Sequence, residues 1–109
     1  LKLRKSQMAR QNNYYRVNSS ENLTATTASG ATRSGGCPDQ ITKVRIATTS
    51  ATSNTFVKIG PGADPTATTA SGVLIPAGES SIFTVVKDDE IAAITNTGTA
   101  TVNITWLEG

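Results

Sequence analysis

Short runs in which apolar and polar residues alternate occupy the last two thirds of the chain. In the clearest run, residues 43–48, Val44 and Ile46 alternate with Lys43 and Arg45. A period of two places successive side chains on opposite faces of a β-strand. The run therefore predicts a strand with Val44 and Ile46 directed inward and both cations directed outward.

Six such runs are separated by turn-forming residues rather than by helical patterns. The predicted strands cover residues 43–48, 55–59, 73–75, 81–86, 91–94 and 101–106. Asn96-Thr97-Gly98 is expected to form a hairpin turn between the last two strands. Short strands at this spacing, with no helix between them, are typical of antiparallel sandwiches and small barrels. We therefore expect an all-β fold, a small antiparallel β-sandwich of the jelly-roll or immunoglobulin-like type, over residues 39–109.

The first third of the chain lacks this pattern. Residues 5–13 fit only a short, poorly capped helix, and residues 18–39 contain Leu23 as their one large aliphatic side chain. So little apolar surface does not offset the conformational entropy that is lost when a segment becomes ordered. We therefore expect residues 1–38 to form an extended basic N-terminal arm and linker that stays extended or mobile until something binds it. A chain without these residues is expected to remain folded.

Charge is also unevenly distributed. Residues 1–16 contain five cations and no acid, whereas the rest of the chain contains five cations and eight acids. A cationic arm with few apolar residues to pack on its own chain is suited to binding another surface. The arm residues expected to bind a partner are Lys2, Arg4, Lys5, Arg10, Tyr14, Tyr15 and Arg16. Phosphate contacts and base stacking offer nucleic acid as an alternative partner, but the acidic body shows no clustered basic face, which disfavours it.

Phe56 and Phe83 are the candidate contact residues on the body. Phe56 shares a strand face with Lys58, and the strand around Ile82 carries apolar side chains on both faces, so we expect it to be covered on both sides. Either arm or loop residues of the same chain fold back over these side chains, or another subunit covers them, because aromatic residues are enriched at interfaces. Phe56 and Phe83 are therefore included among the predicted partner-binding residues.

The chain lacks the side chains on which most active sites depend. It contains no histidine and one cysteine, Cys37, so a histidine base, a Cys–His pair and an intrachain disulfide are all excluded. Cys37 is expected to be a structural thiol, with an interchain disulfide as the alternative. The acidic run Asp88-Asp89-Glu90 is expected to be a solvated turn rather than a glycosidase pair or a calcium loop. We predict no catalytic residue, no metal ligand, no cofactor and no enzymatic activity.

Five stretches follow one another in the body. They are Val44-Arg45-Ile46-Ala47-Thr48, Asp64-Pro65-Thr66-Ala67-Thr68, Leu74-Ile75-Pro76-Ala77-Gly78 leading to Phe83-Thr84-Val85, Glu90-Ile91-Ala92-Ala93-Ile94, and Thr101-Val102-Asn103-Ile104-Thr105. None is specific alone, but in this order they resemble small structural proteins of tailed bacteriophage particles, of the head decoration (cement) type. The resemblance spans about two thirds of the chain and does not include residues 1–38. It implies a non-catalytic, usually oligomeric β-sandwich bound to a capsid lattice or another virion component.

These observations together favour a capsid decoration protein. We expect a homotrimer at the capsid surface of the virion that binds the major capsid protein or other virion proteins, with no membrane and no nucleic acid as partner. Many weak contacts with a repeating lattice would then add up through avidity. The alternatives are a phage neck or tail component, a nucleic-acid packaging protein, and a host-surface carbohydrate-binding adhesion module. The last would have to use Trp106, Phe56 or Phe83 as its aromatic platform.

Overall fold

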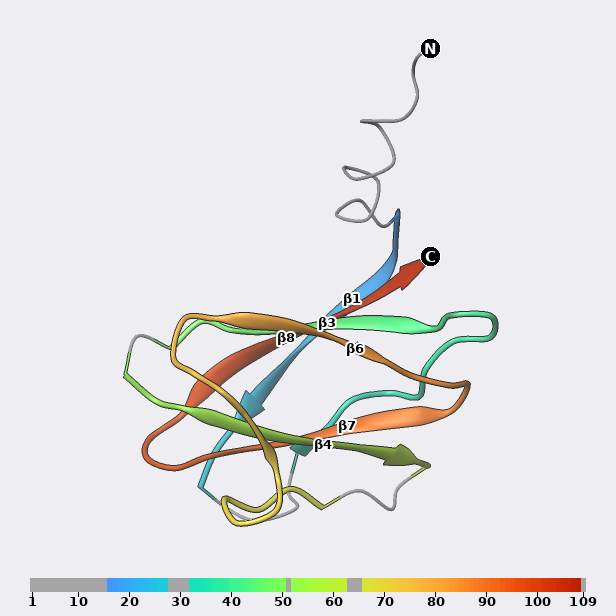
Figure 1. Ribbon diagram of the computed structural model, residues 1–109. Coiled ribbons are helices and arrows are strands. Elements are labelled where there is room, and N and C mark those ends of the chain that lie inside the picture. The colour runs from blue at the N-terminus through green and yellow to red at the C-terminus, as the bar shows by residue number, and fades with distance from the viewer. Residues whose placement is uncertain (1–15, 28–31, 51, 63–65, 109) are drawn as a thin grey trace.

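The computed structural model describes residues 16–27, 32–50, 52–62 and 66–108, with backbone alone at residues 32–33 (Figure 1). This part of the chain contains eight strands and no helix. The strands are β1 (Arg16–Ala25), β2 (Thr32–Arg33), β3 (Lys43–Thr48), β4 (Thr55–Pro61), β5 (Val73–Ile75), β6 (Ser80–Thr84), β7 (Asp89–Thr95) and β8 (Ala100–Glu108). In the described ranges there is accordingly no helix with the length and hydropathy needed to span a membrane.

The strands form two antiparallel sheets of four strands each. Sheet A has the order β1-β8-β3-β6, and sheet B has the order β2-β7-β4-β5. Four of the strand pairs are those expected of one long hairpin whose first arm is β1–β4 and whose second arm is β5–β8. They are β1 with β8, β2 with β7, β3 with β6 and β4 with β5. Pairing of β3 with β8 and of β4 with β7 completes the sheets. This arrangement is the eight-stranded jelly roll, so the predicted all-β sandwich is confirmed.

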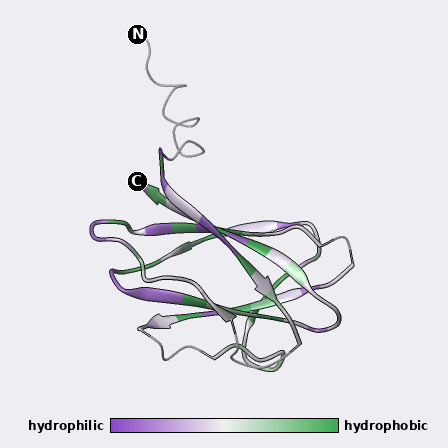
Figure 2. Cartoon of the chain, turned by 180° about the vertical axis from the view of Figure 1, so that it is seen from behind, coloured by the Kyte–Doolittle hydropathy of each residue, from purple (hydrophilic) through white to green (hydrophobic). Residues whose placement is uncertain are grey.

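The predicted alternation places the core between the two sheets. Val44 and Ile46 of β3 are fully buried, as are Val102 and Ile104 of β8, whereas Arg45 is exposed. Figure 2 shows hydrophobic and hydrophilic positions alternating along the strands. All six predicted strands are present, each with ends within two residues of the prediction.

The sandwich begins earlier than the sequence suggested, and this corrects the predicted boundary at residue 38. Strand β1 pairs with β8 through nine residue pairs, and its Leu23 and Ala25 lie in the core. Strand β2 pairs with β7 in the other sheet. The expectation that the chain up to residue 38 needs a partner for order is therefore wrong for residues 16–27 and 32–38. The expected helix at residues 5–13 lies outside the described residues.

The turn after β7 also differs from its prediction. The Thr95 hydroxyl donates to the Gly98 carbonyl over 2.7 Å, and Gly98 has a φ of 64°, which glycine adopts without strain. However, β7 belongs to sheet B and β8 to sheet A, so this turn connects the two sheets and does not close a hairpin. Turn chemistry is local, and it does not specify which sheet the next strand joins.

Candidate docking surfaces

The outer faces of the two sheets differ in how much of the same chain covers them. On sheet B, Ala67 is fully buried and packs with Ala92, Ile94 and Phe56. Gly72 lies so close to Phe56 that a Cβ on this glycine would be 2.8 Å from the Phe56 Cβ. The loop between β4 and β5 therefore folds back over the outer face of sheet B.

On sheet A, the outward-facing residues of β6 remain exposed in the part of the chain that the structure describes. Ile82 is 48% exposed, and Val86, just after the strand, is 65% exposed. The expectation that this strand is covered on both faces is therefore not met. Only its inner face is covered, where Phe83 and Val85 pack against the core.

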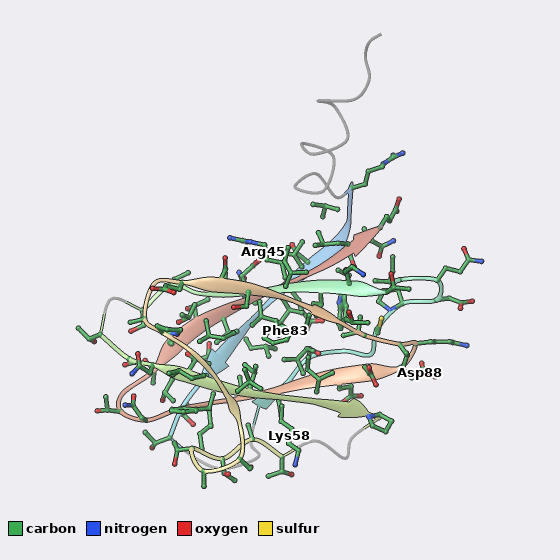
Figure 3. The ribbon with its side chains drawn as sticks, viewed as in Figure 1. Arg45, Lys58, Phe83 and Asp88 are labelled. Atoms are coloured by element: carbon green, nitrogen blue, oxygen red, sulfur yellow. The ribbon has the colours of Figure 1, made fainter. Side chains whose placement is uncertain are left out.

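The two predicted aromatic contact residues have different surroundings. Phe56 lies beneath the loop of its own chain, which is the fold-back alternative, and it is half-buried there. Phe83 is half-buried between the sheets, while Arg45 stands on the outer side of sheet A (Figure 3). The structure thus brings neither aromatic ring onto the outer face of sheet A, and their role in partner binding stays a prediction.

Short polar side chains cover much of the outer face of sheet A. The Asn103 side-chain amide donates to the Asn22 side-chain oxygen over 2.9 Å, and the Thr105 hydroxyl donates to the Asn103 side-chain oxygen over 2.7 Å. In the ladder, Arg45 lies between Thr105 of β8 and Ile82 of β6. No acid occurs among the outward-facing residues of β3, β6 and β8. The face is therefore largely polar and mildly cationic.

Of the predicted arm residues, the structure describes Arg16. Its Nε lies 3.9 Å from Glu108 Oε1, and the two side chains are 89% and 46% exposed. An ion pair this exposed is screened by water and salt and leaves the guanidinium accessible. The other predicted arm contacts, Lys2, Arg4, Lys5, Arg10, Tyr14 and Tyr15, lie outside the described residues.

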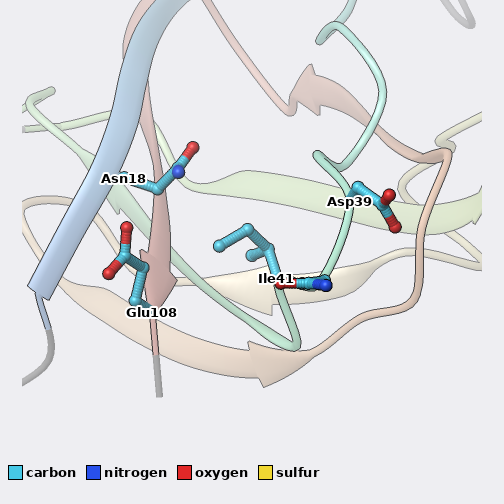
Figure 4. A pocket seen from close by; sticks show the side chains of 5 residues that line it. Asn18, Asp39, Ile41 and Glu108 are labelled. Carbon is cyan, nitrogen blue, oxygen red and sulfur yellow. The ribbon is translucent and has the colours of Figure 1, made fainter.

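A hollow of about 330 Å³ lies beside the start of β1 and the end of β8 (Figure 4). Asn18, Asp39, Gln40, Ile41 and Glu108 line it. These residues offer hydrogen-bonding groups but no nucleophile with an adjacent base. No group of three or more His, Cys, Asp or Glu side chains that could hold a metal ion occurs within the described ranges. The hollow could accept a polar group, and its residues do not form a catalytic arrangement.

The acidic turn before β7 is only partly solvated, which corrects its predicted character at one residue. Asp88 is exposed and has a φ of 72°, whereas Asp89 is 9% exposed. The Asp89 carboxylate accepts a hydrogen bond from the Val86 amide over 2.9 Å. The Cys37 amide donates to the Asp89 carbonyl over 2.7 Å, and the Asp88 amide donates to the Cys37 carbonyl over 3.0 Å. The turn is therefore a structural junction between the segment before β3 and the start of β7.

Cys37 lies at this junction with a free, buried thiol. Its Sγ is 3.5 Å from the Ile41 carbonyl oxygen, and the residue is 2% exposed. Burial raises the pKa of the Cys37 thiol, and the negative charges of Asp89 and Asp88 raise it further. The thiol therefore stays protonated and inaccessible near neutral pH, which supports a structural role over an interchain disulfide.

Two polar residues that hold the segment after β2 in place were not identified from the sequence. The Ser34 hydroxyl accepts a hydrogen bond from the Ile91 amide over 2.9 Å, and Ser34 is only 5% exposed. The Glu21 carboxylate accepts a hydrogen bond from the Gly35 amide over 3.1 Å. Their partners lie 57 and 14 residues away, so no local sequence signal marks either contact.

Comparisons with known proteins found no matching family, no matching curated protein and no matching solved structure.

Proposed function

We propose that this chain is a non-enzymatic virion structural protein that binds and reinforces a bacteriophage capsid lattice as a decoration protein. The resemblance of residues 40–109 to phage decoration proteins supports this proposal. The jelly roll is compatible with it, because the fold occurs in viral capsid domains. Since lectins and cupins also use jelly rolls, the fold alone does not select the function.

Charge separation carries the proposal. Five cations and no acid occur in the first sixteen residues, while eight acids and five cations occur in the rest. Strand β1 begins at Arg16, so the four other cations of this group precede the sandwich in the sequence. Such a segment would attract an acidic lattice surface and orient the mildly acidic sandwich away from it. Many copies on a repeating lattice would then reinforce the particle through avidity.

Removal of residues 1–15 tests this role and leaves all eight described strands in place. We expect the shortened chain to unfold at the same urea concentration as the full chain. It should bind capsids that lack the protein at least about tenfold more weakly, since several charge contacts of about 0.5 kcal/mol each are lost. A full-length control with Lys2, Arg4, Lys5 and Arg10 replaced by Gln should show the same loss. Unchanged saturation of capsids by the shortened chain would refute the proposal.

Removal of residues 1–38 is no longer expected to leave a folded body. That deletion takes away β1 and β2, including the core residues Leu23 and Ala25. The binding experiment must therefore use the boundary at residue 15, because the longer deletion would confuse loss of fold with loss of binding.

The alternatives give distinct results. A carbohydrate-binding module needs an accessible aromatic ring, yet Trp106 is 2% exposed, and Phe56 and Phe83 are half-buried. Binding of the full chain to a glycan array would nevertheless favour that function. Strongly salt-dependent DNA binding by residues 1–16 alone would favour nucleic-acid packaging. Electron microscopy of the intact particle would distinguish a capsid position from the neck or tail.

A further inference from the structure

Among the described residues, no strand pairs with the outer edge of β6. The Val85 amide, directly after the strand, donates to the Thr42 carbonyl over 2.9 Å. Together with the register, this bond shows which residues of β6 form their backbone hydrogen bonds with β3. In an antiparallel ladder, alternate residues bond to the same neighbouring strand. Ser80, Ile82 and Thr84 therefore direct their N–H and C=O groups away from β3, towards the side of β6 on which sheet A ends.

The other three edge strands carry features that hinder the addition of a further strand. β1 contains a bulge between Val17 and Ser19 and the charged residue Glu21. β2 has two residues, and β5 has three. Bulges, charges and short length are the devices by which natural edge strands avoid pairing. β6 has five uncharged residues, no proline and no register shift, so it is the edge suited to strand addition.

We propose that two copies of this chain pair antiparallel through their β6 strands, so that sheet A continues across a two-fold axis. With the axis at Ile82, each Ile82 faces its counterpart, and Ser80 faces Thr84 of the second copy. The 48% exposed side chain of Ile82 would thereby gain an apolar neighbour on the strand face. Such an interface is self-complementary, as a two-fold contact requires.

Charge at the ends of the paired strands fits this register. Glu79 precedes β6 and Lys87 follows it, and both side chains are exposed. β6 ends at Thr84, and Lys87 lies in the turn that follows it. With Thr84 opposite Ser80 of the second copy, this turn comes near Glu79 of that copy, and the same approach occurs at the other end. The two Arg45 side chains would be three strand spacings apart, about 14 Å. That separation exceeds the Debye length of about 8 Å at physiological ionic strength, so their repulsion is weak.

This pairing goes beyond the proposed function and does not depend on it. It predicts a two-fold oligomer, in contrast to the homotrimer that we expect from the sequence for a decoration protein. It concerns the isolated protein in solution, whereas the proposed function concerns binding to a capsid. Each can therefore fail without the other.

Sedimentation equilibrium of the full chain over a concentration series tests the pairing. We expect the mass to rise from 11.3 kDa to twice that value. Ile82→Lys places two ammonium groups across the axis and should raise the dissociation constant roughly 10- to 100-fold. Val73→Lys alters a residue that is 55% exposed on the edge strand β5 and should leave the mass unchanged. A trimer, a monomer at every concentration, or equal effects of both substitutions would overturn the proposal.

A charge swap and amide exchange give independent readouts. Lys87→Glu and Glu79→Lys should each weaken the dimer, and the double variant should restore it. In the unmodified chain, the amides of Ser80, Ile82 and Thr84 should exchange fast when dilute and slowly when dimeric, while the Phe83 amide stays protected throughout. If the mass doubles while those three amides still exchange fast, the copies pair through another surface and the proposal is wrong.

Discussion

Leu23→Ala tests whether β1 is an integral strand of the isolated protein. Leu23 is 7% exposed in the core cluster and lies opposite Val102 of β8. Truncation of a buried leucine to alanine removes apolar contacts and leaves a cavity, which together cost about 2 to 5 kcal/mol. Because β1 is an edge strand that can relax into part of the space, we expect a loss of about 3 kcal/mol in the free energy of unfolding.

Urea denaturation followed by tryptophan fluorescence measures this loss directly. Trp106 is the only tryptophan and is 2% exposed, so its emission should shift to the red when the sandwich unfolds. With a slope of about 1 to 1.5 kcal/mol per molar urea for a domain of this size, the midpoint should fall by about 2 to 3 M.

The matched control lies on the same strand. Val17 is 63% exposed, and Val17→Ala should change stability by less than about 0.5 kcal/mol. If residues 16–38 become ordered only on a partner, Leu23→Ala would behave like Val17→Ala. Equal midpoints for the two variants would therefore refute the assignment of β1 to the sandwich.

Two further predictions concern the junction before β7. Asp89→Ala leaves the Val86 amide without its acceptor and should cost about 1 to 3 kcal/mol, whereas Asp89→Asn keeps an acceptor oxygen and should cost less; urea midpoints of both variants measure the difference. Because the pKa of Cys37 in the folded protein is raised above its ordinary value of 9.0, the unfolded chain loses the thiol proton at a lower pH than the folded chain. Stability should therefore fall as pH rises above that value, by up to about 1.4 kcal/mol per pH unit, and Cys37→Ala should remove this slope. A slope that persists in Cys37→Ala would assign it to other groups.

The strands after residue 40 could be predicted because their signal is local. Apolar and polar residues alternate over residues 43–48, and β3 begins and ends where this pattern predicts. Val44 and Ile46 are directed into the core by this alternation, whichever strands lie beside β3. The pairing of the strands was not predictable in this way. The order of both sheets depends on contacts between distant residues, as in the pairing of β1 with β8.

The contribution of β1 was missed because apolar density is a poor guide to an edge strand. Only Leu23 and Ala25 of this strand are buried, and most of its other residues are exposed and polar. Its backbone is nevertheless paired along β8, which is itself buried by β3 and the opposite sheet. A strand of this kind needs few apolar residues of its own, because β8 provides the partners for its backbone hydrogen bonds. The sequence near residue 23 contains no information about β8.

The earlier start of the sandwich also limits how a cationic segment could act. Fifteen residues extend at most about 50 Å, less than half the span of the thirty-eight residues first assigned to the arm. A small domain is about 30 Å across, so these fifteen residues could span about one adjoining subunit, whereas thirty-eight extended residues could span several. Reinforcement across a lattice by residues 1–15 would therefore gain from joining several copies. Pairing through β6 would supply two segments per assembly, and it predicts that Ile82→Lys, which leaves every arm cation in place, weakens capsid binding through lost avidity. Capsid binding by Ile82→Lys at full strength, despite a monomeric mass, would show that a single segment is sufficient.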